Sequence, residues 1–123
     1  MVKTTQKQFE LFKKYCDKWL DYYELIEWEL DYVHEELDDD KAAMAVFMTA
    51  HRSGYICLNK KFQYIKPVVS NADLDNFAEH EILHIYFAKM HTLIERRDIR
   101  EDEVSEMIHS YIHKQQNIRK KRS

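Results

Sequence analysis

The arrangement of this chain is decided by one stretch, SNADLDNFAEHEILH, which occupies residues 70–84. Ser70 or Asn71 can cap the N-terminus of a helix, and Asp73 in the first turn suits the helix dipole. Apolar residues then recur at helical steps, and no glycine or proline interrupts the chain before Arg96. We therefore predict a helix that runs from near Asp73 to Arg96.

The rhythm of apolar residues changes along the part of the chain that precedes this helix. Over residues 5–22 they recur at steps of three and four, which predicts an amphipathic helix. Over residues 26–35 they alternate with charged ones, which predicts a half-buried strand. Residues 42–49 and 55–58 are further strand candidates, with turn-forming residues 52–54 between them. An antiparallel sheet of about three strands is therefore expected.

A last helix is expected to open between Ile99 and Asp102. Its predicted apolar stripe consists of Val104, Met107, Ile108, Tyr111 and Ile112. The order of helix, strands, helix and helix is typical of an α+β protein. With 123 residues, one glycine and one proline, the chain is expected to form a single domain over residues 1–123, in which the basic run at 119–123 is a frayed tail.

The composition excludes several classes of function. A net charge of −3 argues against nucleic acid as the main partner, since phosphate binding needs a surplus of cations. No apolar run approaches the roughly 20 residues of a membrane-spanning helix, so no membrane partner is expected. The charged N-terminus does not resemble a secretory signal, which predicts a cytoplasmic protein. Cys16 and Cys57 stand alone and are expected to be free thiols.

Residues 80–84, HEILH, fit the pattern H-E-x-x-H. His80 and His84 lie one helical turn apart on the same face, so both imidazoles can bind one tetrahedral zinc ion at about 2.0–2.1 Å. Glu81 is placed to take a proton from a metal-activated water rather than to bind the metal. The pattern therefore predicts hydrolysis at a Zn²⁺ site. The alternative is that the two histidines only decorate a helix.

The motif and its setting resemble the zincin metallopeptidases, and more closely the minimal phage- or prophage-type metallopeptidases of about this length. These share an N-terminal helix rich in Lys and Phe, a Trp-containing strand like residues 25–30, a short antiparallel sheet, the motif helix and a final charged helix. The resemblance covers nearly the whole chain, although only the five-residue motif is specific. It implies that His80 and His84 bind the metal and that Glu81 is the catalytic base. The expected substrate is a peptide or protein, in the host cytoplasm if the chain is phage-encoded.

The third metal ligand must come from elsewhere, because a catalytic zinc normally has three protein ligands and an open position. Gluzincins use a glutamate of the following helix, and Glu103 satisfies their spacing. If the motif helix continues to Arg96 and a short loop follows, however, residues 109–113 come to lie opposite His84. We therefore prefer His109, which borders the predicted apolar stripe. Glu103, Glu106 and His113 stay open as candidates for the same position.

Several further polar residues are weaker candidates. His91 lies on the same helix face as His84 but too far along the axis to share the ion, and it can line a cleft. Tyr86 or Tyr111 can stabilise an oxyanion through its hydroxyl. His34 and His51 are expected in strands, as sheet-face residues rather than ligands.

Residues 55–58 are the predicted edge strand along which an extended peptide pairs. A competing hypothesis is a non-catalytic zinc-binding module that acts by binding a protein during a phage life cycle. A third is a structural protein without metal. The substrate and the oligomeric state stay open.

Overall fold

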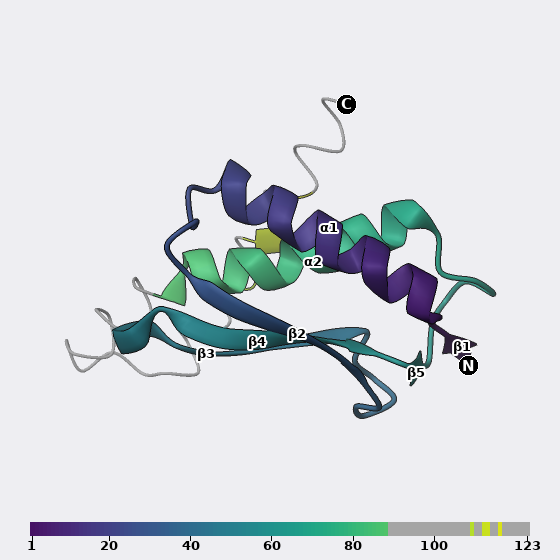
Figure 1. Ribbon diagram of the computed structural model, residues 1–123. Helices are drawn as coiled ribbons and strands as arrows, with labels where there is room; N and C mark the ends of the chain where they lie inside the picture. The colour runs from purple at the N-terminus through teal and green to yellow at the C-terminus, as the bar shows by residue number, and fades with distance from the viewer. Residues whose placement is uncertain (89–108, 110–111, 114–115, 117–123) are drawn as a thin grey trace.

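The computed structural model describes residues 1–88, 109, 112, 113 and 116. Helices α1 and α2 lie side by side on one face of a three-stranded sheet (Figure 1). The elements are β1 (Val2–Lys3), α1 (Gln6–Tyr22), β2 (Glu29–Glu35), β3 (Ala43–Met48), the 3₁₀ helix η1 (Thr49–His51), β4 (Ser53–Asn59), β5 (Lys61–Phe62) and α2 (Asn71–Tyr86). The predicted α+β class is confirmed. The proposed tail at 119–123 and most of the predicted last helix fall outside the described residues.

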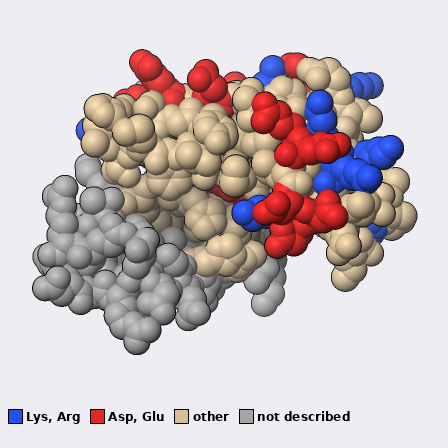
Figure 2. All heavy atoms as spheres, turned by 90° about the horizontal axis from the view of Figure 1, so that it is seen from below, with Lys and Arg blue, Asp and Glu red and all other residues tan. Residues whose placement is uncertain are grey.

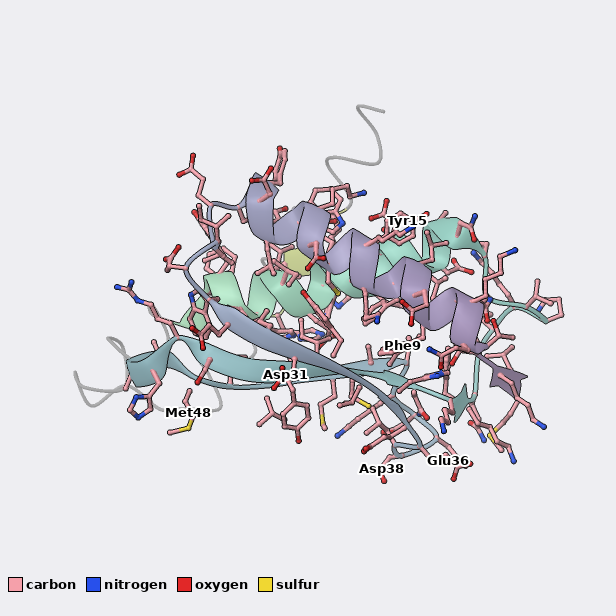
Figure 3. All side chains as sticks on the ribbon, viewed as in Figure 1. Phe9, Tyr15, Asp31, Glu36, Asp38 and Met48 are labelled. Atoms are coloured by element: carbon pink, nitrogen blue, oxygen red, sulfur yellow. The ribbon has the colours of Figure 1, made fainter. Side chains whose placement is uncertain are left out.

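Helix α1 begins where the sequence predicts it. Thr5 caps it, with its side chain accepting from the Gln8 backbone at 3.1 Å while the Gln8 side chain accepts from the Thr5 backbone at 2.9 Å. The apolar side of α1 buries Phe9, Phe12, Cys16 and Trp19. Figure 3 shows Phe9 between α1 and the sheet. The two short strands β1 and β5, which the sequence analysis missed, pair next to the start of α1 (Figure 1).

The sheet has the three strands predicted, but it is mixed rather than antiparallel, because in the order β2-β4-β3 the strand β3 pairs antiparallel with β4 while β4 runs parallel to β2. The chain from β2 to β3 therefore passes the end of β4, where the buried side chain of Asn59 holds it. The Asn59 Oδ1 atom accepts from Leu37 N at 3.0 Å. Its Nδ2 atom donates to the carbonyls of Asp38 at 3.0 Å and Lys41 at 2.6 Å. These bonds satisfy the backbone of the crossing segment and keep β4 central.

The prediction that residues 55–58 form the sheet edge is also wrong, because they lie in β4 with a strand on each side. Among the described strands, β2 and β3 are the edges. Close pairing of β3 with β4 depends on Gly54, the only glycine of the chain. A Cβ atom there would meet the Val46 carbonyl oxygen and lie 2.7 Å from the Phe47 Cα atom.

Helix α2 begins as predicted, and a turn follows it at Phe87. Ser70 caps it, and the Asp73 carboxylate accepts a hydrogen bond from the Ser70 backbone N–H at 3.0 Å. At the other end, α2 is bounded at Tyr86 by a turn at Phe87, whose N–H bonds to the carbonyls of Leu83 and Ile85, and Ala88 is again helical. At this turn the Phe87 side chain is buried with Leu83 and Ile112. Residues 89–96 lie outside the described part.

The face of the sheet that points away from the helices carries several exposed apolar side chains. Val46, Met48 and Tyr55 are exposed there, and Figure 3 shows Met48 on the side of the sheet opposite α1. In Figure 2, uncharged side chains cover the middle of this view, and charged ones of both signs gather to its right.

Two of the expectations from composition can be compared with the fold. Cys16 on α1 and Cys57 on β4 are both buried and free, as predicted. Among the described helices, none has the length and apolar character needed to cross a membrane.

Candidate metal centre

His80, His84 and His109 come together at one point beside α2. The Nε2 atoms of His80 and His84 are 3.2 Å apart, because the residues lie on successive turns of one helix face. The ring of His109 lies 4.9 Å from that of His80 and 5.3 Å from that of His84, between centroids. One nitrogen from each ring can be chosen so that all three lie within 4.8 Å of one another. These three residues are the candidate metal centre.

The donor atoms of this centre fit a zinc ion. Two nitrogens bound to one tetrahedral zinc at about 2.0–2.1 Å are about 3.3 Å apart, close to the separation in the His80 and His84 pair. Imidazole is also a ligand that zinc and other late divalent metals accept.

The protonation of the histidines also favours binding. Burial is the main cause that lowers the pKa of His80 to about 4. The hydrogen bond with Gln116 opposes this lowering, and the neighbouring His109 and His113 add to the lowering. Burial likewise lowers the pKa of His84 to about 4, with contributions from the other histidines. At neutral pH both rings are therefore neutral, and protons do not compete with a metal for their nitrogens.

The side chain of Gln116 orients the His80 ring. The Gln116 Nε2 atom donates to the Asn76 carbonyl at 3.1 Å and to Glu79 Oε1 at 3.3 Å, which fixes the amide orientation. Its Oε1 atom therefore faces His80 Nδ1, at 3.5 Å. Because an amide oxygen only accepts, His80 carries its proton on Nδ1 and keeps the Nε2 lone pair for a metal.

Glu79, which the sequence analysis missed, helps to hold Gln116 in place by accepting its hydrogen bond. Its side chain is 1% exposed, and its Oε2 atom accepts from the Tyr23 hydroxyl at 2.7 Å. A signal for it was present in the sequence, since Glu79 precedes the apolar Ile82 and Leu83 by three and four residues. A glutamate in phase with the apolar stripe of a helix is expected to be buried and hydrogen-bonded.

Glu81, the predicted base, is buried between the helices and the sheet. It is 7% exposed, and its charge adds to the effect of burial in raising the pKa of Cys16 on α1. Burial raises the pKa of Glu81 to about 7, partly offset by a hydrogen bond from the backbone of Ala45 on β3. A carboxyl group with such a pKa exchanges its proton near neutral pH, as a general base must.

The contact with Ala45 places Glu81 at the edge of β3 that pairs with no described strand, called the free edge below. Asn59 N donates to the Ala42 carbonyl, so this facing pair is hydrogen-bonded across β3 and β4. In an antiparallel pair hydrogen-bonded positions alternate with positions whose N–H and C=O groups point away from the partner strand. The backbone groups of Ala43, Ala45 and Phe47 therefore point away from β4, and that of Ala45 reaches Glu81.

His113, which the sequence left open as the third ligand, lies beside the same centre. Its Nε2 atom is 3.0 Å from that of His109, and its ring is 4.9 Å from that of His80. Four more of the predicted candidates, His91, Glu103, Glu106 and Tyr111, lie outside the described residues.

The remaining candidates lie apart from this cluster. His34 is on β2, where its Nε2 atom is 2.8 Å from Thr4 Oγ1 and its ring stacks on Phe9, which confirms a sheet-face residue. The prediction of a strand at His51 is wrong, because it lies in η1, where the chain turns from β3 into β4. Tyr86 contacts the rings of Tyr23 and Phe87.

A scan against protein-family models and searches of curated proteins and of solved structures found no match to this chain.

Proposed function

We propose that this chain is a zinc-dependent hydrolase of the metallopeptidase type. His80, His84 and His109 would hold the zinc ion, and Glu81 would act as the general base. The observation that carries the proposal is the cluster of three imidazoles, with nitrogens within 4.8 Å of one another, next in sequence to a carboxyl group whose pKa is about 7. Bound zinc would polarise a carbonyl oxygen and lower the pKa of a bound water to about 7.

The protein's own contribution is to hold and move a proton. Glu81 is deprotonated in a substantial fraction of molecules near neutral pH, so it can accept a proton from the attacking water. The same carboxyl group can then donate that proton to the leaving amine. Its burial keeps bulk water from competing for this transfer.

The free edge of β3 supports an extended peptide as the substrate. The backbone groups of Ala43 and Phe47 point outward on either side of Ala45, which contacts Glu81. A peptide that added to this edge as a further strand would run past the Glu81 carboxyl group. In this proposal β3 takes the role that the sequence analysis assigned to residues 55–58.

A second candidate function is the non-catalytic zinc-binding module. The observation that favours it is His113, which brings a fourth imidazole to within 3.0 Å of His109. Zinc sites with four protein ligands are typically structural, whereas catalytic sites keep one position open.

Metal content and peptide hydrolysis test the proposal together. We expect about one zinc per chain in the wild type, none in His80→Ala, and full occupancy in Glu81→Gln. Zinc-loaded Glu81→Gln should hydrolyse a mixed peptide library about 10²- to 10⁴-fold more slowly than the wild type. His51→Ala is the matched control, since His51 is exposed and lies in η1.

The outcomes separate the two candidates. Zinc binding without hydrolysis in any variant would favour the non-catalytic module. A chain that binds no zinc, or a Glu81→Gln variant as active as the wild type, would rule out the proposed mechanism.

A further inference from the structure

The candidate centre and His113 beside it form two similar pairs of histidines. His80 and His84 are four residues apart, and their Nε2 atoms are separated by 3.2 Å. His109 and His113 are also four residues apart, and their Nε2 atoms are separated by 3.0 Å. The ring of His80 lies 4.9 Å from each ring of the second pair, so the two pairs face each other.

Both short separations resemble the edge of a tetrahedral coordination sphere. Two nitrogens on one zinc ion are about 3.3 Å apart, so each pair supplies nearly one such edge. A hydrogen bond between two neutral imidazoles would account for either pair by itself. It would not by itself account for two such pairs whose rings lie 4.9 Å apart at the same place.

The four histidines are not equivalent. His80 and His84 are half-buried on α2, whereas His109 and His113 are exposed. The three residues whose ligand nitrogens all lie within 4.8 Å of one another are His80, His84 and His109. His113 is the one of the four that this set leaves out.

We propose that His113 is a fourth and replaceable ligand of the same metal ion. In the resting protein four imidazoles would close the coordination sphere, and release of His113 would open the position that a hydrolytic zinc needs. This inference rests on the metal site of the proposed function, and it assigns to His113 the regulation of that site. It also explains how a centre with four imidazoles can belong to a hydrolase.

Nitrogen NMR of the histidine side chains, recorded with and without added Zn²⁺, tests this directly. A metal-bound imidazole nitrogen has a chemical shift unlike that of either neutral form, so the spectrum counts the ligands. We expect four zinc-bound imidazoles in the wild type and in His51→Ala, and three in His113→Ala. Zinc affinity in His113→Ala should fall by at least the roughly tenfold that loss of an outer-shell partner costs. Exogenous imidazole should then restore a fourth bound ring.

Peptide hydrolysis provides the second readout. His113→Ala should hydrolyse peptides faster than the wild type at saturating zinc, because one coordination position is permanently open. Three zinc-bound imidazoles in the wild type, with the His113 nitrogens unchanged by zinc, would overturn the inference and leave the proposed function intact. No zinc-dependent change in any histidine would overturn both. The wild-type count alone decides the matter if His113→Ala does not fold.

Discussion

Glu79 and Glu81 stand two residues apart on α2 and are both buried, at 1% and 7% exposure, yet their surroundings differ. Glu79 accepts hydrogen bonds from the side chains of Tyr23 and Gln116. Glu81 has a backbone hydrogen bond from Ala45, which only partly offsets the effect of burial on its pKa. Burial of a carboxyl group therefore does not reveal its role. The partners do, and they make Glu79 a support of the His80 side and Glu81 a group able to exchange a proton.

The largest expected effect is that of Glu79→Leu on stability, measured beside Glu81→Leu. Glu79→Leu should lower the free energy of unfolding by about 3 kcal/mol, because the Tyr23 hydroxyl and the Gln116 amide lose a buried acceptor. Glu81→Leu should change it by about 1 kcal/mol or less, since loss of one backbone hydrogen bond is offset by relief of burial. Urea unfolding of the metal-free proteins measures both. Equal losses of unfolding free energy in the two variants would contradict the different roles assigned to the two carboxyl groups.

Local patterns predicted the parts of the fold that local physics determines. The capping boxes at Thr5 and Ser70 mark the starts of α1 and α2, and alternation located β2. The parallel pairing of β2 with β4 was not predictable in this way. It depends on Asn59, whose side chain joins segments about 20 residues apart, and no local pattern marks such an anchor.

The candidate site shows the same division. His80, Glu81 and His84 follow from the spacing of one motif on one helix. The choice of His109 rested on a helix that continues to Arg96, of which the structure describes the part up to Ala88, with a turn at Phe87. The structure brings His109 to the site, and residues 89–108, over which the prediction traced the chain, lie outside the described part. Gln116 escaped the sequence analysis because its role depends on contacts between distant segments, whereas for Glu79 the signal was its phase with Ile82 and Leu83.

Asp73 is the third buried carboxyl group of α2, and its effect on stability depends on pH. Burial by itself would raise the pKa of Asp73, but hydrogen bonds from Lys66, Ser70 and Tyr64 outweigh it and lower the pKa to about 2. A lowered pKa stabilises the fold above the ordinary value of 3.8, and this stability is lost as the pH falls towards 2. The loss should amount to about 2 kcal/mol, since one unit of pKa corresponds to about 1.4 kcal/mol.

Urea unfolding of the metal-free protein at several acidic pH values measures this dependence. Asp73→Asn should be less stable than the wild type near neutral pH, and the difference should shrink as the pH is lowered. A difference that stays constant down to the lowest pH would mean that the charge of Asp73 does not stabilise α2.

The smallest expected effect is the loss of one hydrogen bond to Glu79. Tyr23→Phe removes the hydroxyl that donates to Glu79 at 2.7 Å and should cost about 1 kcal/mol in the free energy of unfolding. Tyr22→Phe is the matched control, because Tyr22 is 63% exposed and should cost much less. In a Glu79→Leu background the Tyr23→Phe change should cost almost nothing, since the hydroxyl has already lost its acceptor. An undiminished cost in that background would mean that Tyr23 stabilises the fold through its ring contacts alone, and that Glu79 is held by other groups.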